Sequence, residues 1–450
     1  MPISEDGRTT RSTQHAPADP ETPRSGQSFR RLAFASLVGT VIEAYDFALY
    51  GVAAALVFPR VFFPSLGGAA GAIASFATLG VAFVARPVGA VLFGHFGDRY
   101  GRKATLIATV LGMGIGTTLM GLIPSATTIG VAAPILIIVL RAVQGLAIGG
   151  EWAGAALLVT EHAPRNRRGL YAMFPQLGAA IPIALSAGTL LLISLMVSPA
   201  TFVAWGWRIP FVATAILTLV ALYIRLKVEE TPAFVQDRKR ATPASAPLRQ
   251  ALRQQPRTIL QGAGVALTTL TFVYVAQSFV ANYGVETLGL SRNQVLGATA
   301  LSGLCYTAFT AISAVLSDKI GRRTMIGSAE IIGVLWALAL FPLLNTGTIA
   351  AYGLALCVTM AIAGLAYGAV AAFLPEQFPT RYRYTAAGIS YQITGVLGGG
   401  VAPLLAPIII EWRGSTAFGF VLAALSAIAA ICTFSLKDRT KDTMDWSLDS

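Results

Sequence analysis

Two acidic residues in the first apolar stretch of the chain have the types and the spacing of a proton-handling site. Glu43 and Asp46 are three residues apart, and Tyr50 follows four residues later. In a helix these three positions share one face. An ionisable side chain within a membrane-spanning helix is costly and by default marks a pathway. We therefore expect this face to look into the protein interior, with Asp46 as the group that takes up and releases a proton and Glu43 beside it.

Two arginines in other apolar stretches could supply the matching positive charge. Arg141 lies ten residues into its stretch, at a depth of about 15 Å. Our hypothesis is that Arg141 keeps Asp46 ionised, and that a substrate carboxylate engaging Arg141 releases Asp46 to accept a proton. The alternative is a fixed Asp46–Arg141 pair that only holds two helices together.

Arg86 is the second arginine, and Pro87 follows it directly. The guanidinium fork suits bidentate capture of a carboxylate. The proline removes a backbone donor and favours a kink, which opens space for a ligand. The alternative is a structural Arg86 bonded to the carbonyls that the kink frees.

Neutral and charged polar residues in further apolar stretches extend this lining. Glu151 lies seven residues after Gln144 and so nearly in line with it on a helix, although a buried structural carboxylate is the alternative for Glu151. The second half is much less charged within its spans, and its neutral hydrogen-bonding groups are typical of substrate recognition, although each could also be a satisfied core residue. The predicted substrate-binding set is Tyr50, Arg86, Arg141, Gln144, Glu151, Gln277, Tyr391 and Gln392.

Membrane-spanning helices must position these residues. Of the 450 residues, 55% are hydrophobic and only 12% are charged, whereas a soluble domain is about a quarter charged. Roughly 20 apolar residues span a bilayer as a helix, and the strict alternation of a barrel strand is absent. We expect an all-α polytopic membrane protein with twelve transmembrane helices, at about 31–54, 70–95, 104–124, 131–159, 170–196, 207–227, 258–283, 294–317, 325–344, 349–374, 385–410 and 415–436.

Two motifs occur twice at nearly the same offset and divide the chain into pseudo-symmetric six-helix halves. Gly97–Lys103 resembles Ser317–Arg323, and the Glu-x-x-Pro-x-x-x-Arg pattern that begins at Glu161 recurs at Glu376. Parallel halves around a midplane site are typical of transporters. The expected organisation is a disordered tail (1–29), a first half (30–227), a linker (228–257), a second half (258–436) and a second tail (437–450).

Most of the 33 Lys and Arg residues fall in the tails and in the loops on one side of the predicted membrane, and they account for the net charge of +12. The positive-inside rule then places both termini in the cytoplasm of a multi-pass cell-membrane protein and argues against nucleic acid. We expect the loop charges to form a latch that opens and closes that side; loop solubility is the alternative. The predicted gating set is Asp98, Arg99, Gly101, Arg102, Glu161, Arg168, Asp318, Arg322, Glu376 and Arg383.

Signals of enzymatic chemistry are weak. The chain has no G-x-x-x-x-G-K-[ST] loop, which argues against a P-loop ATPase. Its three His and three Cys residues lack metal-ligand spacing. We expect no enzyme, cofactor or metal, and we expect a small-molecule substrate, a proton and the lipid bilayer as the partners of a monomer.

The D-R-x-G-R-K loop that begins at Asp98 resembles the signature of the major facilitator superfamily. Further segments resemble its metabolite:proton symporter family, nearest to the shikimate-carrier branch, and only Ala44 departs from the pattern, at a position where that family has Trp. This resemblance implies a proton symporter of a small carboxylate or zwitterion by alternating access. A sugar-porter-like facilitator and a transport-inactive membrane sensor are the alternatives. The segments are Gly39–Phe47, Arg86–Pro87, Phe93–Asp98, Arg141–Gly145, Gly149–Trp152, Trp207–Phe211, Glu230–Phe234 and Phe378–Tyr384.

Overall fold

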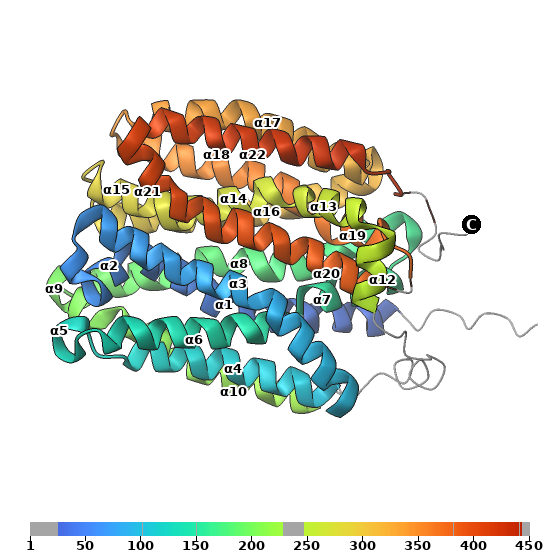
Figure 1. Ribbon diagram of the computed structural model, residues 1–450, viewed down its shortest axis with the longest axis horizontal. Helices are drawn as coiled ribbons and strands as arrows, with labels where there is room; N and C mark the ends of the chain where they lie inside the picture. Colours follow the sequence, from blue (N-terminus) through green and yellow to red (C-terminus); the bar gives the residue numbers. More distant parts are fainter. Residues whose placement is uncertain are drawn as a thin grey trace, which may run out of the picture.

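The computed structural model describes residues 26–100, 102–149, 151–227, 247–380, 382–440 and 442, and these residues contain helices and no strand. The chain is apolar, and every backbone N–H and C=O group inside a bilayer needs a hydrogen-bond partner within the protein, which a helix supplies. The long helices run side by side along the longest axis of the molecule (Figure 1). The all-helical fold class predicted from the sequence is confirmed.

Six spans form the first half, and short helices cap their ends. Between the first two spans the chain makes α2 (Phe58–Phe62), and α9 (Pro199–Thr201) leads into the sixth. Gly150 lies outside the described residues, between the two parts of the fourth span. The spans are α1 (Gly26–Leu56), α3 (Gly68–Tyr100), α4 (Arg102–Leu122), α6 (Ala132–Ile148) with α7 (Glu151–His162), α8 (Arg168–Met196) and α10 (Arg208–Lys227).

Six further spans form the second half, and three of them, the seventh, the tenth and the eleventh, are interrupted. The seventh is built from α13 (Pro256–Val265), α14 (Leu267–Tyr274), the π-helical η4 (Val275–Val280) and α15 (Ala281–Glu286). The eleventh joins α20 (Arg383–Thr394) to α21 (Ala402–Arg413) through the π-helical η5 (Gly395–Val401). The others are α16 (Arg292–Ile320), α17 (Arg322–Leu344), α18 (Ile349–Tyr367) with α19 (Val370–Glu376), and α22 (Ser415–Ser435).

The count of spans agrees with the twelve expected. Ten helices among the described residues are long and apolar enough to cross a membrane, and the α13–α15 segment, bent by 40°, makes an eleventh. The helix α4 supplies the twelfth, with a shorter apolar stretch at Ile107–Leu122. Large apolar side chains on the outside, such as Leu192 at 64% exposure, are typical of a surface that faces lipid.

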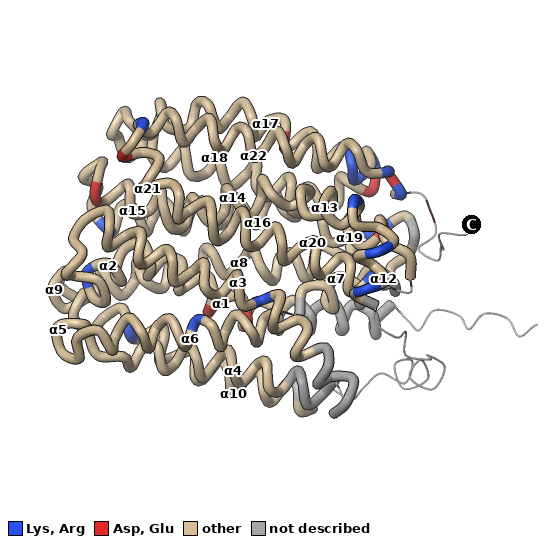
Figure 2. Tube along the Cα trace, viewed as in Figure 1, with Lys and Arg blue, Asp and Glu red and all other residues tan. Residues whose placement is uncertain are grey.

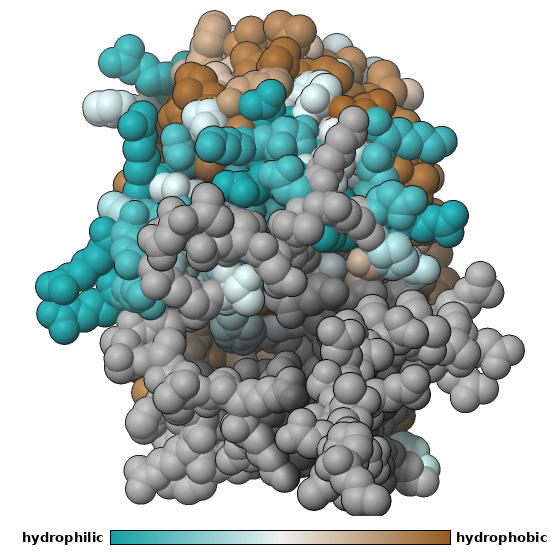
Figure 3. All heavy atoms as spheres, turned by 90° about the vertical axis from the view of Figure 1, so that its right-hand side faces the viewer, coloured by the Kyte–Doolittle hydropathy of each residue, from teal (hydrophilic) through white to brown (hydrophobic). Residues whose placement is uncertain are grey.

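The two described chain ends lie at the same end of the bundle, which we call the terminal end; the other is the distal end (Figure 1). Charged positions gather at these two ends, and only a few lie midway, near α1 and α6 (Figure 2). Viewed from the terminal end, the described surface carries a band of hydrophilic side chains (Figure 3). This distribution is that of a protein whose middle lies in hydrocarbon.

The halves meet along two long seams. In one, α8 packs against α16, and Gly303 allows the contact because a Cβ there would meet the backbone nitrogen of Ala184 at 2.5 Å. In the other, α3 packs against η5, and a Cβ at Gly399 would meet the Phe83 ring at 2.4 Å. Small residues at close helix contacts are typical of membrane proteins. These seams bring the polar residues of both halves to the middle.

Some details differ from the sequence-based expectation. The break at Ala266 in the seventh span was not predicted, and in the eleventh span the glycine run Gly398–Gly400 lies in the π-helical η5. The short helix α12 (Pro247–Gln254) lies within the expected linker. Helix α1 already begins at Gly26, so part of the expected tail is helical, and residues 1–25 lie outside the described residues.

Candidate functional site

Two buried arginines share one aromatic ring in the middle of the first half. Arg141 is 0% exposed and Arg86 is 8% exposed. Each guanidinium carbon lies 4.4 Å from the centroid of the Phe47 ring. Arg141 also lies 3.7 Å from the Tyr50 ring, and Arg86 lies 4.4 Å from the Phe83 ring. Cation–π contacts of this kind are strongest where water is excluded, and here they hold two positive charges close together.

Helix α4 fixes the orientation of Arg141 through a glutamine. One Arg141 nitrogen, Nη1, donates to Gln144 Oε1 at 2.8 Å. The Gln144 amide nitrogen donates in turn to Thr117 Oγ1 at 2.5 Å and to the Met113 carbonyl at 3.3 Å. The Nε and Nη2 atoms of Arg141 are buried and have no hydrogen-bond partner. Gln144 therefore positions Arg141 and leaves two of its donor atoms available.

Asp46 is buried beside this arginine but does not pair with it. Its side chain is 5% exposed and lies close enough to Thr117, Glu43 and Arg141 to interact electrostatically with them. No ion pair joins Asp46 and Arg141, two residues that the structure describes, and the Asp46 Oδ1 atom accepts no hydrogen bond. The direct pair considered from the sequence is thus replaced by a looser arrangement, in which an acceptor oxygen of Asp46 stays open.

Arg86 reaches across the seam between the halves. Its guanidinium lies close enough to the hydroxyl groups of Tyr274 and Tyr391, both from the second half, to interact electrostatically with them. Its Nη1 lies 3.9 Å from the place where a Cβ on Gly395 would be. The Arg86 Nε is buried without a partner. Arg86 lies within electrostatic reach of Arg141, so the two arginines can act on one ligand.

An aromatic wall continues the site into the second half. The Tyr391 ring stacks on Trp152 of the first half, with centroids 3.9 Å apart and planes at 2°. Its hydroxyl lies 3.4 Å from that of Tyr367, whose ring stacks on Tyr306 at 5.7 Å. Flat aromatic surfaces with hydroxyl groups at their edges suit a small ring-shaped or branched metabolite.

Of the remaining predicted binding residues, Gln392 and Gln277 have no contact with the two arginines among the contacts described above. Gln392 donates through Nε2 to the Gly149 carbonyl at 2.7 Å, which links the two halves, and its Oε1 is unpaired. Gln277 is buried in η4, with Oε1 3.2 Å from a Cβ built on Gly51. The side chain of Glu151 lies outside the described residues.

At the terminal end, Asp318 of the second half caps a helix of the first half. Its two carboxylate oxygens accept the backbone N–H groups of Gly169 at 2.8 Å and Leu170 at 2.9 Å. Arg322 donates to the same carboxylate at 3.0 Å. A carboxylate at a helix N-terminus bonds free N–H groups and opposes the positive end of the helix dipole.

A second carboxylate, Glu376, is shared by two arginines at the same end. Arg322 reaches Glu376 Oε1 at 2.6 Å, and Arg168 from the other half reaches it at 3.3 Å. Arg383 bonds its own loop, at the Phe378 carbonyl. Arg383 is not part of this group. We call the four residues that are joined by these bonds the terminal cluster: Arg168, Asp318, Arg322 and Glu376. Gly101 and the side chains of four other predicted gating residues lie outside the described residues: Asp98, Arg99, Arg102 and Glu161.

The distal end is also bridged between the halves. Arg60 forms an ion pair with Glu286 at 2.8 Å, and the Asn282 amide donates to the Ala55 carbonyl at 3.0 Å. The Arg60–Glu286 pair is about half exposed, and exposed pairs contribute little to stability. In this conformation both ends hold the halves together, the terminal end through the more deeply buried bonds.

Sequence reasoning missed the aromatic supports of the arginines and the backbone partners of Asp318. Phe83 lies one helical turn before Arg86, and Phe47 directly follows Asp46. An aromatic residue one turn away from a buried arginine was therefore a usable signal. Nothing in the sequence indicates that Asp318 bonds backbone N–H groups 148 and 149 positions away.

Comparison with known proteins gives consistent matches over most of the chain. The model of the family "Sugar (and other) transporter" matches residues 32–265 and 252–443. The "Inner membrane metabolite transport protein YhjE" of Escherichia coli (strain K12) is 40% identical over 409 residues, which are 90% of this chain and 93% of that protein. The "Shikimate transporter" of the same organism is 40% identical over 417 residues, 91% and 94% of the two chains.

More distant relatives agree with these. The "Proline/betaine transporter" of Salmonella typhimurium (strain LT2) is 32% identical over 424 residues, 91% of this chain and 83% of that protein. Among solved structures, the crystal structure of a D-xylose-proton symporter superposes with a TM-score of 0.72 at 19% identity, over 92% of this chain and 98% of that one. At that identity the likeness concerns the fold alone.

Proposed function

The chain belongs to the sugar (and other) transporters of the major facilitator superfamily, and from this premise we propose that it carries a small organic monocarboxylate together with one proton. Its relatives are membrane transporters and not enzymes. Our proposal concerns the chemical class of the substrate, the coupling ion and the residues that bind each of them.

The observation that carries the proposal is the pair of buried arginines with unpaired N–H groups. Arg141 has two buried nitrogen atoms without a partner, and Arg86 has one. Burying such donors without acceptors is costly, so an acceptor from a ligand would be strongly favoured. A carboxylate is the acceptor whose geometry and charge suit a guanidinium best. A neutral sugar offers hydroxyl oxygens as acceptors but no negative charge to match the guanidinium groups.

Charge balance indicates the coupling. Among the side chains that the structure describes, the buried centre holds two arginines and two carboxylic groups, Glu43 and Asp46, and these four charges cancel when all are ionised. A bound monocarboxylate adds one negative charge that a low-dielectric interior disfavours. A proton on Asp46, whose Oδ1 is open, restores neutrality. A zwitterion such as a betaine would bind without that proton.

The arrangement also supports a division of labour within the site. Arg86 and Arg141 bind the carboxylate, and Asp46 holds the proton. Gln144 orients Arg141 through their 2.8 Å bond. Tyr391, stacked on Trp152, contacts the body of the substrate. Ala44, next to Glu43, is small where the resembling family has Trp, and this favours a cargo different in shape from that of the relatives.

The ends of the bundle then work as alternating gates. We assign the terminal end to the cytoplasm because its loops hold most of the basic residues of the sequence. The terminal cluster closes this end, and opening it requires separating Asp318 from the backbone of α8. The two halves rock about the buried centre, as in other transporters built from repeats.

Uptake into proteoliposomes under separately imposed gradients tests the proposal. The panel is shikimate, glycine betaine and D-xylose, and the wild type should accumulate shikimate with an inside-alkaline pH gradient. Because one anion and one proton carry no net charge, accumulation should not respond to a membrane potential at zero pH gradient. Accumulation driven by the potential alone would contradict the proposed stoichiometry.

A matched pair of variants assigns the proton to its residue. Asp46→Asn should abolish accumulation and keep the exchange of labelled for unlabelled shikimate, while Glu411→Gln, an exposed carboxylate on α21, should leave both unchanged. Equal loss of exchange and accumulation in Asp46→Asn would count against its coupling role. Wild-type exchange without accumulation would indicate a facilitator, and binding without exchange would indicate a sensor.

A further inference from the structure

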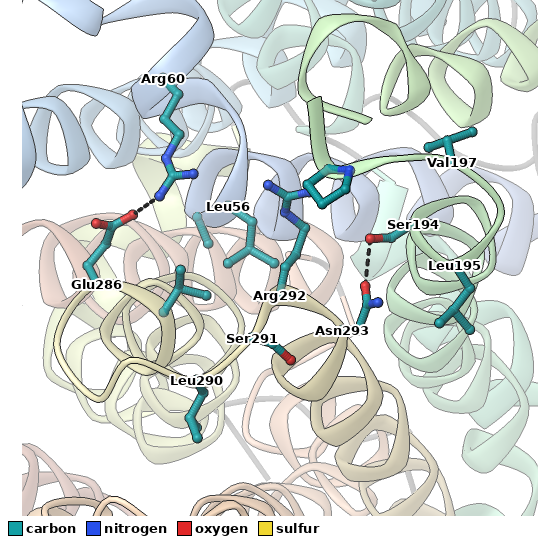
Figure 4. A pocket seen from close by; sticks show the side chains of 13 residues that line it. Leu56, Arg60, Ser194, Leu195, Val197, Glu286, Leu290, Ser291, Arg292 and Asn293 are labelled. Atoms are coloured by element: carbon teal, nitrogen blue, oxygen red, sulfur yellow. Dashed lines mark hydrogen bonds and ion pairs between the residues drawn. The ribbon is translucent and has the colours of Figure 1, made fainter. Parts of the chain in front are cut away.

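A cavity of about 530 Å³ opens at the distal end, between the two halves. The first half lines it with the ends of α1, α2 and α8, and the second half with α15 and the start of α16. In Figure 4 the Arg292 side chain extends between the Arg60–Glu286 pair and the Ser194–Asn293 hydrogen bond. The volume is within the range of small-molecule sites. This cavity is separate from the centre formed by Asp46 and the buried arginines.

The cavity holds more positive than negative charge. Arg60 is paired with Glu286 at 2.8 Å, and Arg60 and Arg292 lie close enough to interact electrostatically. Arg292 stacks 4.6 Å from the Phe202 ring, and no carboxylate among the described residues forms an ion pair with it. One cation therefore remains without a counter-charge at a place that a small ligand can fill.

Neutral donors lie beside this cation. Asn293 accepts a hydrogen bond from the Ser194 hydroxyl at 2.6 Å through Oδ1, which leaves its amide N–H groups for another partner. Arg292 and Asn293 open the 29-residue helix α16, in which Ser291 caps the N–H of Gln294, while the N–H groups of Arg292 and Asn293 lie ahead of the first intrahelical bonds. The guanidinium, the side-chain amide and the positive end of a long helix all favour an anion with several acceptor oxygens.

The cavity lies at the distal end of the helix that carries Asp46. Leu56, which lines it, is ten residues beyond Asp46 on the same helix α1, a rise of about 15 Å. The Arg60–Glu286 pair that bridges the halves here is about half exposed on both sides. A weak, exposed pair exchanges partners readily, so an incoming carboxylate can replace Glu286 on Arg60.

We propose that this cavity is a vestibular binding site for small organic carboxylates, with Arg292 as its principal ligand and Arg60 and Asn293 as supports. The ligand class rests on the proposed function. The site holds the anion at the distal mouth before it enters the centre, and its occupation loosens the Arg60–Glu286 bridge. The loss of one charged contact should weaken binding on the order of tenfold or more.

Saturation-transfer NMR on the purified full-length protein tests this site apart from the centre. The background variant is Arg141→Gln, which removes a central ligand. The probes are shikimate and its neutral methyl ester. We expect shikimate to give signals in the Arg141→Gln protein that the methyl ester does not give. Adding Arg292→Gln should remove these signals, and adding Arg292→Lys should keep them in part because the charge is retained.

Arg413→Gln is the matched control. Arg413 also lies at the distal end, stacked over Trp412 at 5.8 Å, but it does not line the cavity. Shikimate signals that survive Arg292→Gln, or that are lost equally in Arg413→Gln, would overturn the vestibular site, as would equal signals from the methyl ester. If wild-type proteoliposomes transport no carboxylate while the Arg292-dependent signals remain, the proposed function fails and the vestibular site stands.

Discussion

Replacing Asp318 by Asn should open the terminal end of the bundle. Asp318 joins the halves through two hydrogen bonds to backbone N–H groups, from Gly169 at 2.8 Å and from Leu170 at 2.9 Å. Asn has nearly the same shape, keeps a single acceptor oxygen and carries no charge. One of the two bonds is therefore lost, and the other becomes a bond between neutral groups.

The size of the effect follows from these two bonds. A hydrogen bond to a charged group is worth about 1.5–3 kcal/mol, and a neutral one about 1 kcal/mol. Losing one charged bond and weakening the other shifts the equilibrium between closed and open terminal ends by about 2–5 kcal/mol. Each 1.4 kcal/mol is a factor of ten, so the ratio of open to closed molecules should rise by roughly 30- to 4,000-fold.

Pulsed electron spin resonance can measure this shift. Spin labels on Asn166 of the first half and on Arg253 of α12, which packs against α20 of the second half, report the separation of the halves at the terminal end, since both residues are exposed there. The three native cysteines, which are free thiols, are first replaced by alanine. The wild type should give mainly one distance, and Asp318→Asn should give a larger population at a longer distance.

Asp438→Asn provides the control. Asp438 carries the same charge at the same end, but it bonds Thr440 of its own half. It should leave the distance distribution of the wild type unchanged. A distribution in Asp318→Asn identical to that of the wild type would falsify the role of Asp318 as a bond between the halves.

Three further substitutions have distinct readouts. Arg86→Lys keeps the charge and loses the planar fork, so the KM for shikimate should rise about tenfold with little change in protein yield, and an unchanged KM would remove Arg86 from the binding site. Gly399→Ala forces a Cβ to within 2.4 Å of the Phe83 ring, so it should destabilise the protein by about 1–3 kcal/mol; an unaltered thermal unfolding curve would contradict the tight contact. Gln392→Ala removes the 2.7 Å bond to the Gly149 carbonyl, and a loss of about 1 kcal/mol should appear as a lower unfolding temperature, whereas no shift would mean that water replaces the bond.

Periodicity, composition and the doubled motif were enough to predict the twelve helices and their two halves, because lipid allows few solutions to the backbone hydrogen-bonding problem. Helix continuity was less predictable. The break at Ala266 falls at an alanine, where neither Pro nor Gly marks it in the sequence.

The sequence was enough to identify the individual site residues, but it did not predict which side chains they contact. Asp46, Arg86 and Arg141 were identifiable because ionisable groups are rare in apolar stretches. Their contacts were not, since an arginine can be stabilised by a carboxylate, a carbonyl or an aromatic ring, and only the folded chain selects among these. Here Phe47 serves both arginines, where the sequence-based hypothesis relied on Asp46.

The π-helical segments give the seventh and eleventh spans a way to change their faces. A π segment holds one more residue in a turn than an α-helix does. If η5 (Gly395–Val401) relaxed to the α form, the extra residue would have to move along the span. One residue corresponds to about 100° of rotation and 1.5 Å of rise. Rotation of α21 about its own axis, with α20 held in place, would then present a different set of side chains to the centre.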